Sequence, residues 1–162
     1  MEILINLKTL GKKSRRIRPV SFIYEKKPET LREFIDQTVL IMVRTFKERQ
    51  KKSKEGFLPE ALSEQAINDM AELGKVAFGY IYNENEVSKE KAIKTAEDAV
   101  IDGLVKIFIN GSDITDMALD LRNVEIDEIE AFYASHLEKK IEINEGDQVT
   151  FVKLAMLAGR RW

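Results

Sequence analysis

The chain has 162 residues, of which 44% are hydrophobic and 33% charged, and its formal net charge is −2. This length suits one domain over residues 1–162, with a core that needs no metal or disulfide to hold it. The sequence has no cysteine and one histidine, His136, which excludes thiol chemistry, thiolate metal sites and any site that needs two imidazoles. No apolar run reaches the length of a membrane span and the first residues do not resemble a signal peptide, so we expect a cytoplasmic protein.

Two apolar stretches near the amino terminus, residues 3–9 and 17–24, predict a β-hairpin joined by a polar loop. In the first stretch, alternate residues are apolar and should face a core, namely Ile3, Ile5 and Leu7. The second stretch contains Pro19, which has no N–H to donate to a neighbouring strand. The second strand should therefore lie at the edge of its sheet.

Residues that recur at intervals of three and four predict an amphipathic helix of about 20 residues from Pro28, followed by a loop over residues 51–56. The recurring positions are Leu31, Phe34, Ile35, Thr38, Val39, Met42, Val43 and Phe46. A second helix is expected after Ser63 and a third after Ser88, because serine is a favoured N-cap. Residues 102–103, Asp-Gly, should end the third helix.

The β-branched run over residues 104–109 ends at Asn-Gly, which predicts a strand followed by a tight turn. A further helix is expected over about 125–138, and a short strand at 141–143. Residues 145–147 should form a turn. The final strand, 148–157, is too uniformly apolar to have one face in water, so we expect it at the centre of the sheet.

This order of elements resembles the β-grasp fold of ubiquitin and of the small sulfur-carrier proteins. Residues 105–111, VKIFING, look like the third strand and turn of those carriers, and residues 144–151, NEGDQVTF, look like the approach to their last strand. The resemblance covers about half of the chain. It implies an α+β fold with a mixed sheet, formed by a core of residues 1–51 and 104–162 with a helical insertion at about 52–103, and it places the last strand beside the first.

The sulfur carriers end in Gly-Gly, whose carboxylate is activated for transfer, whereas this sequence closes with LAGRRW. A ubiquitin-like carrier or modifier is therefore kept as an alternative function rather than as the first choice.

Charge is divided unevenly along the sequence. Residues 1–55 hold 15 basic and 7 acidic side chains, and residues 56–162 hold 11 and 21. Either the two parts neutralise each other within the chain, or the basic residues form a docking surface for an acidic partner or a phosphate backbone. A first basic run lies in the hairpin loop, and a second comprises Arg44, Lys47, Arg49, Lys51, Lys52 and Lys54. The candidate partner-binding residues are Lys12, Lys13, Arg15, Arg16, Arg18, Arg160, Arg161 and Trp162.

The sequence has no glycine-rich phosphate loop and no Ca²⁺-loop spacing. We interpret His136, which follows Ser135, as a surface or boundary residue, and the acidic stretch over residues 113–130 as a solvated face. The function we expect is that of a non-enzymatic protein-binding or adaptor module, with no cofactor, no metal and another protein as its partner. Nucleic-acid binding through the basic hairpin loop is a second alternative.

Overall fold

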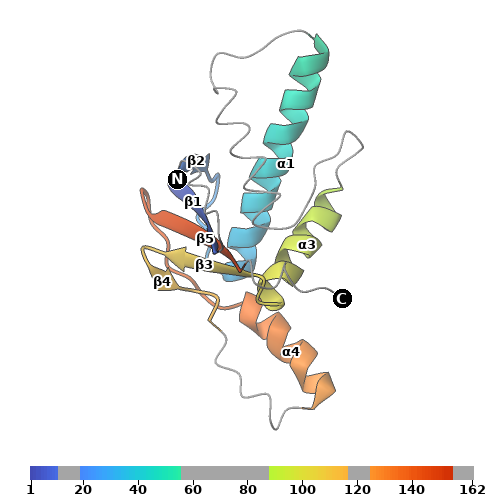
Figure 1. Ribbon diagram of the computed structural model, residues 1–162, viewed down its shortest axis with the longest axis vertical. Coiled ribbons are helices and arrows are strands. Elements are labelled where there is room, and N and C mark those ends of the chain that lie inside the picture. The colour runs from blue at the N-terminus through green and yellow to red at the C-terminus, as the bar shows by residue number, and fades with distance from the viewer. Residues whose placement is uncertain (11–18, 56–87, 117–124, 155–162) are drawn as a thin grey trace.

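A computed structural model describes residues 1–10, 19–55, 88–116 and 125–154 of the chain. The described elements are, in chain order, β1 (Glu2–Leu10), β2 (Val20–Ile23), α1 (Leu31–Glu55), α3 (Lys89–Ile101), β3 (Val105–Ile109), β4 (Ser112–Asp113), α4 (Ile126–Leu137) and β5 (Gln148–Leu154). They form an α+β fold in which helices accompany one five-stranded mixed sheet (Figure 1). The helix expected after Ser63 lies outside the described residues.

The strand order in the sheet is β2-β1-β5-β3-β4. β1 pairs with β5 in parallel and with β2 antiparallel, and β3 pairs antiparallel with β5 and β4. The predictions of a hairpin at the amino terminus and a central last strand are thus confirmed. β2 begins directly after Pro19 and occupies the sheet edge, where a residue without an N–H is tolerated.

The core lies between the sheet and α1. Ile3 and Ile5 on β1 are fully buried, as their alternation predicts. Phe34 of α1 stacks on Tyr24, with ring centroids 5.8 Å apart, and on Phe151 of β5, with centroids 6.1 Å apart. The seven recurring positions of α1 from Leu31 to Val43 are buried and the eighth is half-buried, which confirms the amphipathic helix.

The predicted limits of α1 are wrong at both ends. Thr30 caps the helix, since its Oγ1 accepts a hydrogen bond from the N–H of Glu33 at 3.2 Å, so Pro28 precedes the first turn instead of forming it. At the other end, residues 51–55 are helical and not a loop. This run lacks an apolar stripe, but Lys and Glu have high intrinsic helix propensity.

α3 begins and ends as the sequence predicts. The Ser88 side chain accepts a hydrogen bond from the N–H of Lys91, and Asp102 caps the carboxyl end. α3 packs beside α1 (Figure 1). The helix α4 also agrees with its prediction. No helix in these described ranges is both long and apolar enough to cross a bilayer.

The short strand predicted at residues 141–143 is not formed. An isolated β-bridge joins Lys140, the residue just before this segment, to Thr30, and the N–H of Ile141 donates to the carbonyl oxygen of Glu29. The segment runs along the entrance to α1 and not along a sheet strand, so no ladder can extend. Ile143 is nevertheless fully buried, which explains why its sequence looks like that of a strand.

Candidate binding groove at the sheet edge

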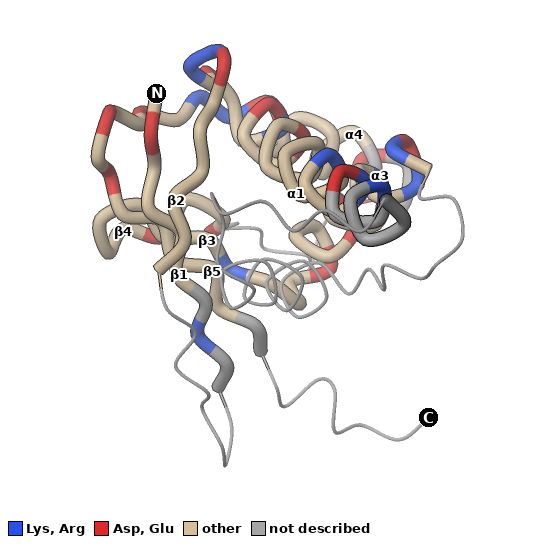
Figure 2. Tube along the Cα trace, turned by 90° about the horizontal axis from the view of Figure 1, so that it is seen from above, with Lys and Arg blue, Asp and Glu red and all other residues tan. Residues whose placement is uncertain are grey.

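All eight residues that the sequence nominated for partner binding fall in segments outside the described residues, at 11–18 and 155–162. Of the second basic run, Arg44 is engaged within the chain, where its Nη1 lies 2.9 Å from Oε1 of Glu25. Arg32 joins the two oppositely charged parts of the chain through Glu97 and Glu138. Basic and acidic positions also lie close together at several places along the described chain (Figure 2). Some of the charge asymmetry is therefore neutralised internally.

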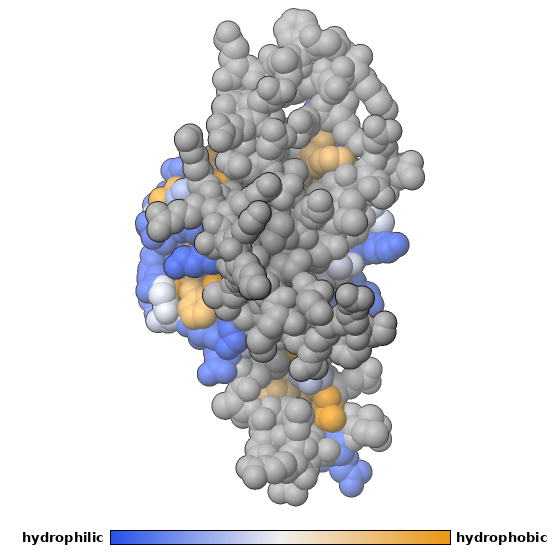
Figure 3. All heavy atoms as spheres, in the orientation of Figure 1, coloured by the Kyte–Doolittle hydropathy of each residue, from blue (hydrophilic) through white to orange (hydrophobic). Residues whose placement is uncertain are grey.

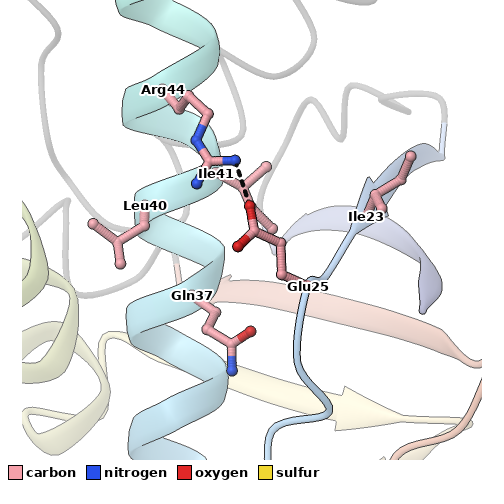
Figure 4. A pocket seen from close by; sticks show the side chains of 6 residues that line it. All are labelled: Ile23, Glu25, Gln37, Leu40, Ile41 and Arg44. Atoms are coloured by element: carbon pink, nitrogen blue, oxygen red, sulfur yellow. Dashed lines mark hydrogen bonds and ion pairs between the residues drawn. The ribbon is translucent and has the colours of Figure 1, made fainter.

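A groove opens between the end of β2 and the middle of α1 (Figure 4). Its lining residues are Ile23, Glu25, Gln37, Leu40, Ile41 and Arg44. The groove has a volume of about 110 Å³. Sites for drug-sized ligands and cofactors enclose roughly 300–1,000 Å³, so this groove suits one or two side chains of a partner better than a whole metabolite.

Ile23 makes this edge of the sheet unusual. The strand alternates buried and exposed residues, with Val20 and Phe22 inside and Ser21 and Ile23 outside. An outward position on an edge strand normally carries a polar residue, yet Ile23 is 70% exposed. On the face shown in Figure 3, the orange apolar areas of the described residues are small and separate.

The backbone at this edge also has free hydrogen-bonding capacity. Tyr24 and Met1 exchange two hydrogen bonds, of 2.8 and 3.0 Å, across the β1–β2 pair. Because bonded and non-bonded pairs alternate in an antiparallel ladder, Ser21 and Ile23 turn their N–H and C=O groups away from β1. In the described sheet β2 has no strand on that outer side.

The ion pair at the rim of the groove can be broken with little loss of folding free energy. The side chains of Glu25 and Arg44 are 78% and 60% exposed, and an ion pair this exposed contributes little to stability because water and salt screen it. In Figure 4 the Glu25 carboxylate reaches up from the segment after β2 to the Arg44 guanidinium on α1. A partner carboxylate could take the place of Glu25 on Arg44.

His136 and Ser135 do not form a catalytic pair. The Ser135 hydroxyl donates to the carbonyl oxygen of Phe132 at 2.7 Å. His136 is 8% exposed and therefore buried, which corrects the surface or boundary placement expected from the sequence. The turn of α4 that carries it packs against Thr115, whose backbone is hydrogen-bonded to the ring, and burial lowers the pKa of the imidazole.

The acidic stretch does not form a metal site in the part that the structure describes. Asp113 accepts a hydrogen bond from Lys106 Nζ at 2.9 Å and two more from Thr115. Among the described residues, no group of three or more His, Cys, Asp or Glu side chains is placed to hold a metal ion.

Comparison of the chain with protein-family models, with curated proteins and with solved structures finds no match. The groove was not identified from sequence, because its lining comes from two separate segments, residues 23–25 and residues 37–44. The one local signal was Ile23, an apolar residue between two inward-facing aromatic residues on a strand expected at the edge.

Proposed function

We propose that this protein is a non-enzymatic protein-binding module that takes up an extended segment of another protein at the outer edge of β2. The observation that carries this proposal is the outward-facing backbone of Ser21 and Ile23 beside an apolar groove. In strand addition, main-chain hydrogen bonds supply affinity and pockets for alternate side chains supply specificity. This edge offers both.

The lining of the groove defines the segment that fits it. Ile23, Leu40 and Ile41 favour an apolar side chain, and the exposed Arg44 favours an acidic one. Since alternate residues of a strand point to the same side, the ligand should carry apolar residues at every second position with a carboxylate near one end. The described part of β2 spans four residues, so a ligand of about five to seven residues would cover it.

We further propose a structural relationship to the β-grasp proteins, which the strand order and the parallel β1–β5 pair support. A cytoplasmic location and the absence of a cofactor stay predictions. No described residue favours a carrier function or nucleic-acid binding over peptide binding, since the residues proposed for those functions lie outside the described segments.

The proposal can be tested by selecting binders from a displayed library of random dodecapeptides with the full chain as bait. The expected binders alternate apolar residues and carry an acidic residue. Added to ¹⁵N-labelled protein, they should shift the amide resonances of Ser21 and Ile23 and slow the exchange of these amides with solvent.

Two lysine substitutions form a matched pair for this experiment. Ile23→Lys places a charge in the groove and should weaken the selected peptides at least tenfold, or about 1.4 kcal/mol. Leu104→Lys alters the other large apolar side chain that the described residues expose, away from the groove, and should leave binding unchanged. Peptides that shift other amides, or that bind Ile23→Lys as tightly as the native chain, would refute the proposal.

A further inference from the structure

A cluster of charged side chains joins α1, α3 and the end of α4. Arg32 Nη1 donates to Glu97 Oε1 on α3 at 2.6 Å, and Arg32 Nε donates to Glu138, the residue that caps α4. Asp36 lies one turn along α1 from Arg32. Three carboxyl groups from three segments therefore surround one guanidinium.

Asp36 is the member of the cluster whose hydrogen bonding is incomplete. Its Oδ1 is buried and has no hydrogen-bond partner in the described residues. The group that faces it from α3 is the Glu97 carboxyl. Ionised carboxylates only accept hydrogen bonds, so the two can bond to each other only when one of them carries a proton.

The surroundings of Asp36 favour its protonated form. Burial raises the pKa of Asp36 to about 6, and the like charge of Glu97 acts in the same direction. Arg32 opposes the rise, while Glu138 adds to it. These are the charged groups that face Asp36 from α1, from α3 and from the end of α4 within the described residues.

Both apolar and polar contacts hold α3 in place. The fully buried residues of α3 are Ala92, Ala96, Ala99 and Val100, and Ile93 and Ile101 are partly buried against the same core. Three of the four fully buried side chains are alanines, which remove little apolar area from water, so the polar cluster adds to a modest apolar contact. α3 is also followed by Gly103, whose φ of +69° marks a change of chain direction before β3.

We propose that a proton shared between Asp36 and Glu97 acts as a latch between α1 and α3, so that α3 opens more readily once the proton is lost. Below the pKa of Asp36 the two carboxyls are joined by a hydrogen bond. Above it, three negative charges face the single positive charge of Arg32. Because the native state holds this proton more tightly than the unfolded chain does, docking weakens as pH rises through the range from about 4 to about 6.

The test is amide hydrogen exchange of the full chain at pH values from 5 to 8, with rates corrected for the intrinsic effect of pH. The protection factors of the α3 amides should fall about tenfold over this range. A shift of the pKa from 3.8 to about 6 limits the whole effect to about a hundredfold. In Asp36→Asn, whose neutral amide keeps a hydrogen bond to Glu97, protection of α3 should be independent of pH.

A second variant, Glu97→Gln, removes the negative charge that faces Asp36 from α3. In this variant too, the protection of the α3 amides should not change between pH 5 and pH 8. Asp98→Asn is the matched control, because Asp98 lies on the exposed side of the same helix and pairs with Lys94 at 3.5 Å. The Asp98→Asn protein should show the same fall in α3 protection with rising pH as the native chain. The latch is refuted if protection of native α3 does not change with pH, if Asp36→Asn retains the fall in protection, or if β5 loses protection to the same extent.

Discussion

At the scale of single residues, Tyr24 and Thr38 form a buried hydrogen-bonded pair. Their hydroxyl oxygens are 2.6 Å apart, and Thr38 Oγ1 lies 2.6 Å from the carbonyl oxygen of Phe34. A threonine hydroxyl has one proton, which this geometry assigns to Phe34, so Tyr24 donates to Thr38. Burial raises the pKa of the phenol, and the residue stays neutral while it packs on Phe34.

We expect Thr38→Val to lower the free energy of unfolding by about 1–3 kcal/mol, because it leaves the Tyr24 hydroxyl buried without an acceptor. Tyr24→Phe should cost less, about 0.5–1.5 kcal/mol, since Thr38 keeps its bond to Phe34. Urea denaturation of both variants measures the difference. A Thr38→Val protein at least as stable as Tyr24→Phe would contradict the assigned proton direction.

His136 gives a pH-dependent prediction with a defined sign. Burial lowers its pKa below the usual 6.5, so the native state binds this proton less tightly than the unfolded chain. Its contribution to stability is therefore complete above pH 6.5 and is lost as pH falls below it. The difference in unfolding free energy between the native chain and His136→Gln should shrink from pH 7.5 to pH 5.5. A constant difference would show that the native and unfolded chains hold this proton equally tightly, and it would contradict the lowered pKa.

At the scale of elements, the turn between β3 and β4 both reverses the chain and holds the start of β5. Asn110 and Gly111 both have positive φ, +48° and +88°, as a two-residue hairpin requires. The Asn110 side chain also accepts a hydrogen bond from the N–H of Gln148 at 3.0 Å and donates to Asp147 at 2.9 Å. One residue thereby sets the turn and fixes the start of β5 beside it.

Gly111→Ala should lower the unfolding free energy by about 1–2 kcal/mol, because alanine disfavours positive φ. A Cβ at this position would meet no atom within 4 Å, so the loss is conformational and not steric. Gly111→Asn should cost less, since asparagine tolerates this region of backbone space. Thermal denaturation of the two variants tests the order, and equal melting temperatures would contradict it.

At the scale of the whole molecule, β5 connects two hairpins. The β1–β2 pair lies on one side of it and the β3–β4 pair on the other. Phe151 on β5 is fully buried and stacks on Phe34 of α1, so it links both halves of the sheet to the main helix. The described sheet should therefore unfold as one unit.

Phe151→Ala should lower the unfolding free energy by about 3–5 kcal/mol, through lost burial and the cavity left behind. Thr150→Ala, a change at the neighbouring half-buried position of the same strand, should cost about 1 kcal/mol or less. Denaturation monitored at once by a helix signal and by a sheet signal checks cooperativity. Two separate transitions in the native chain would show that the halves unfold independently.

Much of the fold was predictable because the periodicities were strong. The alternation around Ile3 and Ile5, the helical spacing from Leu31 and the Asn-Gly turn after Ile109 each identified an element correctly. The predictions were wrong where an element's limits are not set by the local pattern of apolar residues. The end of α1 depends on backbone propensity without an apolar stripe, and Ile143 is buried without belonging to a strand.

The candidate site was much less predictable than the fold. The groove depends on how α1 crosses the end of β2, and the cluster at Asp36 depends on the approach of Glu97 from another helix. Neither distance follows from local sequence. The terminal and loop residues that the sequence nominated were chosen for their charge and, in Trp162, for an aromatic side chain, and such features mark a surface without specifying its shape.

The parallel pairing of β1 with β5 has a consequence for synthesis of the chain. Leu4 pairs with Gln148, so β1 leaves the ribosome long before its neighbour exists. At about 5–20 residues per second, roughly 7–30 s separate the two strands during translation. Throughout that interval the inner edge of β1, with its row of unpaired backbone groups, is open to other nascent chains and to chaperones. The described sheet can close only when β5 has emerged from the ribosome.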